Sequence, residues 1–210
     1  MVERDHCGAG ASGGFLGALM PHSPERWNGK KDFQFHALVE LEDEIARLES
    51  ETGLECGYRR VGRLLPLGSE RARSTALDRT ADARTNWGGR FRFEVNHTPD
   101  HHDWPNILWA PHGVVHETLS ARLSPPDLIQ ALSARLAAMP NVQLRQGVAV
   151  ASVAPTGRTA QMSDGSQVSF GHLALANGVE AFAMIAEAAG APLRSLGGAV
   201  KGQAALLEAD

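Results

Sequence analysis

The sequence predicts an α/β fold, and three observations carry this prediction. The chain has 210 residues, 43% of them hydrophobic, which is long enough to bury one large core or two small ones. Segments whose apolar residues recur at helical spacing alternate with segments of strand-like pattern. The 22 glycines and 11 prolines lie among these segments and not in low-complexity runs, which indicates a turn-rich globular chain.

Composition excludes several classes of protein. Twenty Lys and Arg against 24 Asp and Glu give a net charge of −4, too weak a field to steer the chain onto nucleic acid or an anionic membrane. Cys7 and Cys56 match no ligand spacing, which excludes a disulfide framework and a zinc ribbon. We find no signal-peptide pattern and no membrane span, and we therefore expect a protein of the reducing cytoplasm.

For the first part of the chain, the sequence predicts a loop and two helices with a strand between them. Residues 8–18 hold five glycines, which is typical of a loop whose backbone comes close to a partner. Apolar residues at steps of three and four predict a helix over 31–52, with Gly53 as its stop. A strand over 60–67 and a helix over 69–87, behind a serine cap, follow.

The middle of the chain predicts an irregular layer and a third long helix. Residues 88–116 are rich in aromatic residues and histidine and are interrupted by three prolines, as expected of short strands and loops. Ser124 then caps a helix that has proline in its first turn and an acid near its positive end. This helix is expected to end at 140–141.

A series of strand-like segments follows this helix. Strands are predicted over 142–145, 148–153, 159–162 and 167–170, with a hairpin turn at Asp164-Gly165. Further predictions are a buried strand over 172–176, a tight turn at Asn177-Gly178, a helix over 179–189 and a strand over 199–208. Strands, helices and a hairpin in this order are typical of an α/β nucleotide-binding fold.

The segment from Gly8 to Gly13 matches the dinucleotide pattern G-x-G-x-x-G, but its context argues against that function. The pattern needs a buried parallel strand before it and a helix after it, whereas charged residues precede this segment and prolines follow it. A different interpretation fits better. Residues 2–4 are the end of the second strand of such a unit, and Glu3 accepts hydrogen bonds from the ribose of an adenine nucleotide.

These residues carry a resemblance to a known family. Glu3-Arg4, then Gly10-Ala11-Ser12-Gly13 and Gly17-Ala18-Leu19 with Pro21, resemble the segment after the second strand in the D-amino-acid oxidase and glycine oxidase family of FAD-dependent oxidoreductases. Further segments are similar to the family in the same order: 52–54 with 60–64, 123–125, 148–153, 175–178 and 201–203. The family's first strand with its glycine turn, and its second half, have no match, so the resemblance is to a fragment.

The resemblance implies a fold and an activity. The fold is an FAD-binding Rossmann-like domain, residues 1–57 and 118–190, interleaved with an antiparallel substrate-domain layer, residues 58–117 and 191–210, incomplete at both ends. The activity is oxidation of a small amine or amino acid by hydride transfer to the flavin of FAD, which gives an imine that hydrolyses. No catalytic side chain is assigned.

The resemblance also implies seven FAD-binding residues. Glu3, beside Arg4, would bind the ribose, Ser12 and Gly13 would line the flavin side of the pyrophosphate, Val150 would present its backbone to the adenine, and Ala176 with Gly178 would close over the phosphates. Asn177 and Glu180 depart from the family, which has a small residue and often tryptophan there. A solvated terminal charge is the competing interpretation of Glu3, and a core strand residue that of Val150.

Other chemistry fits the residues less well. The histidines of 100–103 and of His112 and His116 could suggest metal ligands, but neighbouring Pro and Gly disfavour a helix that would hold them on one face, and we expect loops and surface. Ser12 lacks the strand that leads into a hydrolase nucleophile elbow. The four tryptophans, at 27, 87, 104 and 109, are expected to serve packing and turns.

Two questions stay open at this point. Relatives of this kind include glycine-oxidase-like enzymes acting on free amino acids and the oxidase domain that removes a carboxymethyl group from the wobble uridine of tRNA, and the absence of a basic balance favours the former. The alternative function, from another class, is that of a cofactor-free, inactive fragment or a partner-dependent interaction chain of the same fold. It would expose apolar surface around residues 142–176 and associate with a partner chain or as a homo-oligomer.

Overall fold

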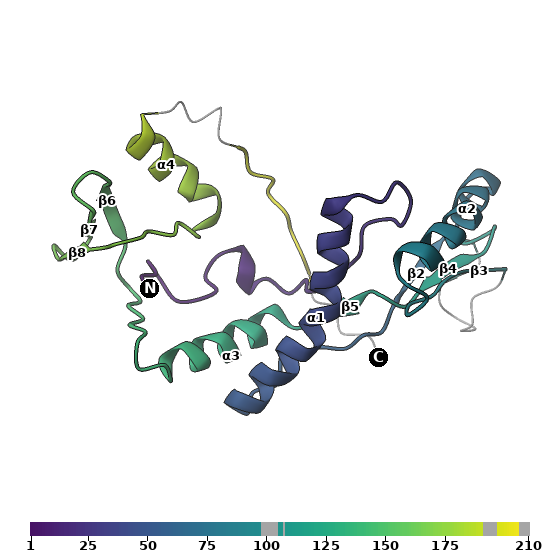
Figure 1. The fold of residues 1–210 in the computed structure, drawn as a ribbon, viewed down its shortest axis with the longest axis horizontal. Helices are drawn as coiled ribbons and strands as arrows, with labels where there is room; N and C mark the ends of the chain where they lie inside the picture. The colour runs from purple at the N-terminus through teal and green to yellow at the C-terminus, as the bar shows by residue number, and fades with distance from the viewer. Residues whose placement is uncertain (98–104, 107, 191–196, 206–210) are drawn as a thin grey trace. The chain divides into compact units, whose positions relative to one another are not determined.

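The computed structural model describes residues 1–97, 105–106, 108–190 and 197–205, and these pack as two compact units (Figure 1). The central unit comprises Leu16–Leu132, and the terminal unit joins Met1–Phe15 to Ser133–Asp210. The architecture is mixed α/β with antiparallel sheets. No helix within the described residues is long and apolar enough to span a membrane.

Two strand pairings and two helices build most of the central unit. Its elements are β1 (Ala18–Leu19), α1 (Gly29–Thr52), β2 (Arg63–Pro66), α2 (Glu70–Asn86), β3 (Phe93–Asn96), β4 (Val114–Glu117) and β5 (Ala121–Arg122). Strands β2, β4 and β3 form an antiparallel sheet in that order, and β1 pairs antiparallel with β5. A further helix, α3 (Pro125–Ala137), begins in this unit and ends in the terminal unit.

The ends of α1 and α2 follow from capping chemistry. The Asn28 side chain accepts hydrogen bonds from the first free amides of α1, and Gly53 ends that helix in the left-handed conformation with φ +70°. The Ser69 hydroxyl caps α2 by accepting from the Ala72 amide. Both predicted helices, the Gly53 stop and the serine cap are confirmed, although α1 starts two residues earlier than 31.

The strand predicted over 60–67 is shorter in the structure because Gly62 interrupts it. Gly62 has φ +71°, and a Cβ there would lie 2.5 Å from the carbonyl oxygen of Glu117. Its amide donates to the Ser120 carbonyl at 2.9 Å, outside the β2–β4 ladder. The close approach of the two backbones therefore requires glycine, and regular pairing begins only at Arg63.

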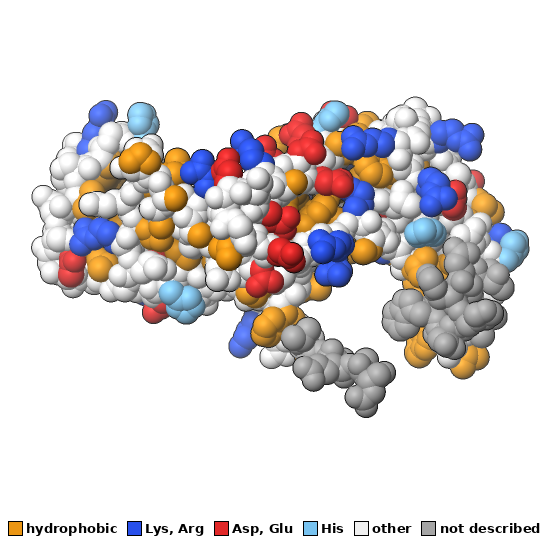
Figure 2. Space-filling view, turned by 90° about the horizontal axis from the view of Figure 1, so that it is seen from below, with side chains coloured by type: hydrophobic (Ala, Val, Ile, Leu, Met, Phe, Trp, Pro, Cys, Tyr) orange, Lys and Arg blue, Asp and Glu red, His pale blue; other side chains and the backbone are white. Residues whose placement is uncertain are grey.

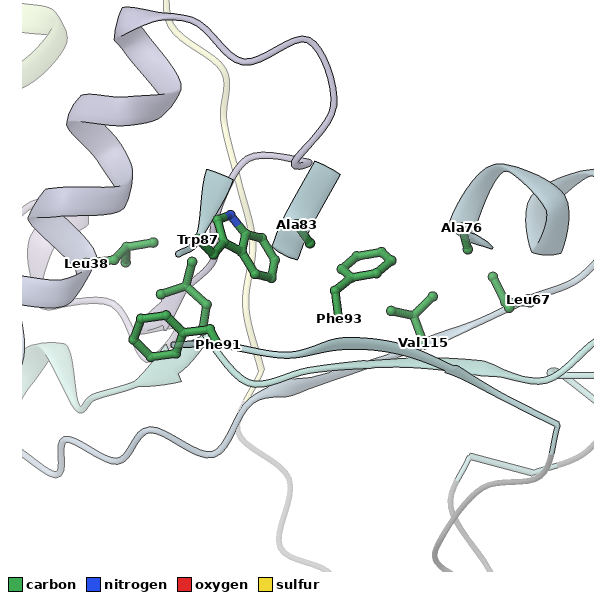
Figure 3. Close-up of a cluster of buried hydrophobic side chains, with 9 residues drawn as sticks. Leu38, Leu67, Ala76, Ala83, Trp87, Phe91, Phe93 and Val115 are labelled. Carbon is green, nitrogen blue, oxygen red and sulfur yellow. The ribbon is translucent and has the colours of Figure 1, made fainter. Parts of the chain in front are cut away.

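The core of the central unit consists of two clusters. The cluster between α1, α2 and the three-stranded sheet is drawn in Figure 3: Leu38, Leu67, Ala76, Ala83, Trp87, Phe91, Phe93, Val115 and Leu119. A second cluster joins α1 and α3 to the β1–β5 pair: Ile45, Leu48, Cys56, Tyr58, Ala121 and Ala131. The apolar stripe predicted for 31–52 thus supplies buried side chains to both clusters.

The terminal unit is built on a small antiparallel meander and a short helix. Its elements are the 3-10 turn η1 (Ala11–Gly13), β6 (Val150–Ala154), β7 (Thr159–Met162), β8 (Gln167–Ser169), the 3-10 turn η2 (Gly178–Glu180) and α4 (Ala181–Ala189). Strand β7 lies between β6 and β8. The predicted turn at Asp164-Gly165 is confirmed, since Gly165 has φ +83° and the Met162 amide donates to the Ser166 carbonyl at 2.8 Å.

Three predicted strands are wrong. Residues 142–145 form only a parallel bridge between Arg145 and Val2, residues 172–176 are irregular and mostly exposed, and the described part of 199–208, residues 199–205, is irregular and exposed. A strand needs a hydrogen-bonded neighbour along its length; 142–145 has one only at the bridge beside residues 1–3, and the other two segments pair with no strand among the described residues. Apolar composition alone therefore overpredicted strands.

Candidate functional site

All seven residues that the sequence suggested for FAD belong to the terminal unit. Its first residues run beside residues 143–148, although the two segments are more than 130 positions apart. The Glu3 amide donates to the Arg145 carbonyl at 2.8 Å, and the Val148 amide donates to the Glu3 carbonyl at 3.2 Å. Val2 and Arg145 form a parallel bridge, which agrees with residues 2–4 being the end of a parallel strand.

Glu3 is half-buried at the end of this segment. Its carboxylate accepts one hydrogen bond from the described residues, from the Asp5 amide to Oε1 at 3.2 Å. Its Oε2 atom makes no hydrogen bond in the described part of the chain. The carboxylate therefore keeps acceptor capacity for a hydroxyl donor, which suits the role suggested by the resemblance.

Arg4 joins this segment to the turn that precedes α4. Its Nη1 atom lies 2.9 Å from Oε2 and 3.2 Å from Oε1 of Glu180. The hydrogen bond to Glu180, together with the charges of Glu180 and Asp5, raises the pKa of the Arg4 guanidinium. Both side chains are more than half exposed, so the pair contributes little to stability but compensates the charge of Glu180 locally.

The glycine loop folds back on itself. A Cβ on Gly13 would lie 2.0 Å from the Gly8 carbonyl oxygen, so the close approach of these two backbones excludes any larger residue at position 13. Residues 11–13 form the single 3-10 turn η1, and Ser12 is exposed on it. No regular strand precedes the loop and no α-helix follows it directly, which confirms that Gly8 to Gly13 is not a G-x-G-x-x-G fingerprint.

The remaining predicted site residues lie on β6 and around η2. Val150 is half-buried at the start of β6, paired with Met162, and is followed by a bulge. Ala176 is exposed in irregular backbone, and Gly178 starts η2 with φ +62° and no atom within 4 Å of a Cβ placed on it. The predicted turn at Asn177-Gly178 is confirmed, and the following helix starts at Ala181 instead of 179.

The structure thus connects some of the predicted site residues and leaves others separate. Glu3 is tied by backbone hydrogen bonds to the segment that leads into Val150, and Arg4 is tied to Glu180, two residues after Gly178. No hydrogen bond links Ser12 or Gly13 to the other five within the described residues. The partnership of Arg4 with Glu180 was missed by sequence reasoning, because opposite charges 176 positions apart give no local pattern.

The histidines and tryptophans lie partly as expected. No group of three or more metal-ligating side chains occurs among the described residues, and 98–104 lie outside them, so the histidines and Trp of that segment are untested. His112 lies in a turn and His116 on β4, not on a helix. Trp87 is buried in the core, as expected of a packing residue, whereas Trp109 is 76% exposed in a turn.

Comparison with solved structures shows the fold. Glycine oxidase from Geobacillus kaustophilus matches with a TM-score of 0.74 and 18% identity over 90% of this chain and 50% of its own. Glycine oxidase from Bacillus cereus ATCC 14579 matches with a TM-score of 0.70 and 19% identity, over 89% of this chain and 51% of its own. Iminodiacetate oxidase from Chelativorans sp. BNC1 matches with a TM-score of 0.61 and 23% identity, over 88% of this chain and 50% of its own. The chain therefore spans about half the length of these proteins.

Comparison with sequences gives the family. No curated protein sequence matches the chain. The family model described as DAO, FAD dependent oxidoreductase, matches residues 1–210. The resemblance drawn from Glu3-Arg4 and the later segments is confirmed, and so is the α/β fold of FAD-dependent oxidases. This chain belongs to the FAD dependent oxidoreductase family.

Proposed function

We propose that this chain contributes the FAD-binding part of an enzyme that oxidises a small amine or amino acid. The observation that carries the proposal is the family match over residues 1–210. The amino acid and amine oxidases among the solved structures of similar fold support the substrate class. The proposal includes the domain assignment, with residues 1–57 and 118–190 binding FAD and 58–117 and 191–210 forming the substrate layer, and a cytoplasmic location.

The residues of the terminal unit fit an adenine dinucleotide. Glu3 retains an unused carboxylate oxygen, and the backbone at Gly10 and Gly178 is open, with no atom within 4 Å of a Cβ placed there. Glycines with open space beside them let a ligand approach the main chain closely. The charge of Glu180, which would repel a pyrophosphate, is compensated by Arg4 at 2.9 Å.

In this proposal each residue binds or positions, and none performs the chemistry. Glu3 accepts hydrogen bonds from the ribose hydroxyls, and Val150 presents its backbone to the adenine. Ser12 and Gly13 line the pyrophosphate on one side, and Ala176 with Gly178 covers it on the other. Bound FAD supplies a flavin ring that accepts a hydride from the amine-bearing carbon of the substrate.

The charge distribution supports a small-molecule substrate over tRNA. Basic and acidic side chains are interspersed on the face shown in Figure 2. The net charge of the chain is −4. Proteins that bind RNA through its phosphates concentrate Lys and Arg on one surface. We therefore propose a free amino acid or small amine as the substrate.

The first test is the visible spectrum of the purified 210-residue chain. A flavin band that copurifies at near-equal molar ratio, or that returns when FAD is added to the colourless protein, supports the proposal. A folded chain that stays colourless and does not quench the fluorescence of added FAD contradicts it and supports the cofactor-free, partner-dependent alternative.

The second test is substitution of the ribose-binding acid. Glu3→Gln should weaken FAD binding about tenfold or more, because hydrogen bonds to a charged acceptor contribute roughly 1.5–3 kcal/mol. Glu40→Gln, on the exposed face of α1, is the matched control and should leave the dissociation constant unchanged. Equal affinities of the two variants would exclude Glu3 from the site.

The third test addresses the ion pair. Arg4→Gln should weaken FAD binding because it leaves the Glu180 carboxylate without its counter-charge near the proposed pyrophosphate site. Adding Glu180→Gln to this variant should restore part of the affinity. An unchanged affinity in Arg4→Gln would mean that the pair is remote from the cofactor.

A further inference from the structure

The central unit contains a pocket that the proposed flavin site does not use. It has a volume of about 590 Å³ and lies between the segment 21–24, strands β2, β3 and β4, and helix α2. Trp87, Phe93 and Val115 of the core cluster in Figure 3 line it. The pocket shares no residue with the seven proposed FAD-binding residues, and its volume falls in the range of small-molecule sites.

Two of the residues that line this pocket carry a buried N–H group without an acceptor. The indole Nε1 of Trp87 and the guanidinium Nε of Arg79 make no hydrogen bond among the described residues, whereas the Nε of Arg63 lies 3.2 Å from the Glu117 carboxylate. Trp87 as a whole is only 1% exposed. Because a buried donor without an acceptor costs about 1–3 kcal/mol, native structures hold few of them. Two such donors around one pocket indicate an acceptor that the described residues do not provide.

The charges around the pocket leave one positive charge uncompensated. Arg63 lies 3.2 Å from Glu117, and Arg79 lies 2.8 Å from Glu25. Arg71, also in the lining, forms no ion pair within the described residues. The two paired arginines are therefore neutralised, and Arg71 gives the lining a net charge of about +1 at neutral pH.

The paired arginines are held in place by the buried Glu117 and the half-buried Glu25. Glu117 is fully buried and also accepts the amides of Leu119 and Ser120, at 2.8 and 2.9 Å, and the Ser120 hydroxyl. Glu25 is held by hydrogen bonds from its own backbone, Ser23 and Arg79; burial opposes its ionisation, but these bonds prevail and lower its pKa. Fixed arginines beside an apolar floor are a preorganised site for an anion.

We propose that this pocket binds a carboxylate that carries an apolar group. The carboxylate oxygens accept from the indole of Trp87 and the guanidinium groups, and they neutralise Arg71. The apolar group packs on Leu65, Phe93 and Val115, which line the same pocket. The site needs no flavin, so this proposal can be tested independently of the proposed oxidase activity.

The test uses the full 210-residue chain and hydrocinnamate, an aryl-alkyl carboxylate, as the probe. The readout is the indole ¹H–¹⁵N resonance of Trp87, assigned by triple-resonance spectra and checked by its loss in Trp87→Phe. Hydrocinnamate should shift this resonance downfield in a saturable manner, because a charge-assisted hydrogen bond forms at the indole proton. Hydrocinnamyl alcohol, which has the same apolar group but no charge, should bind at least about tenfold more weakly.

Variants of the unpaired arginine decide the role of charge. Arg71→Gln should weaken hydrocinnamate binding by about tenfold or more, the effect expected of one lost charge-assisted contact. Arg84→Gln, on the same helix but outside the pocket lining, is the matched control and should bind as the unmodified chain does. The proposal is overturned if hydrocinnamate leaves the Trp87 resonance unmoved up to about 10 mM, a concentration at which even a weak site is occupied. Equal affinity for the alcohol, or an unchanged affinity in Arg71→Gln, would overturn it as well.

Discussion

The buried carboxylate of Glu117 should be a principal determinant of the stability of the central unit. It is 0% exposed, accepts two backbone amides and the Ser120 hydroxyl, and lies 3.2 Å from Arg63. Glu117→Ala would leave these donors without an acceptor and a guanidinium without its counter-charge. Removal of one member of a buried ion pair costs about 3–5 kcal/mol, and we expect about 4 kcal/mol here, since Arg63 is partly exposed to water.

Urea unfolding followed by circular dichroism measures this loss, which corresponds to a fall in Tm of about 10 °C for a chain of this length. Glu117→Gln keeps the shape and part of the acceptor capacity, so its loss should be about half as large. Glu94→Gln on the neighbouring strand β3 is the control, because its side chain is 45% exposed and pairs only loosely with Arg92, at 3.7 Å. A loss in Glu117→Ala no greater than that of the control would refute the role of the buried acid.

Three further predictions concern a cap, a turn and the two thiols. Asn28→Ala removes the side-chain cap of α1 and should lower the unfolding free energy by about 1 kcal/mol in urea; no change would mean that the cap is redundant. Hydrogen bonds from Ser166 hold the pKa of Asp164 below its ordinary value of 3.8, so the ionised form stabilises the fold above that pH, and this contribution disappears as the pH falls through the lowered pKa. Thermal melts should therefore show Asp164→Asn less stable than the unmodified chain at neutral pH and equal to it in strong acid, and equal stability at neutral pH would contradict this. The Cys56 thiol is 0% exposed, and burial raises its pKa, whereas Cys7 is half-buried. An aromatic disulfide reagent should therefore modify Cys7 first and Cys56 only when the chain unfolds. Equal reaction rates of the two thiols would contradict the burial of Cys56.

Sequence alone was sufficient where structure is set by local chemistry. The helices α1 and α2, the Gly53 stop, the Ser69 cap and the Asp164-Gly165 turn were predicted because apolar spacing, capping side chains and turn residues act over a few neighbouring positions. The rejection of the G-x-G-x-x-G match rested on local context as well. The family resemblance from Glu3-Arg4 onward was also available in the order of short motifs along the chain.

Tertiary structure decided everything that depends on partners distant in sequence. Residues 172–176 are apolar enough for a buried strand but have no hydrogen-bonded neighbour in the described part of the chain. Arg4 pairs with Glu180, and Arg63 with the buried Glu117, only because the folded backbone brings these residues together. A paired strand, an ion pair or a pocket requires at least two segments that are close in space. The sequence of one segment does not show which distant segment will lie beside it.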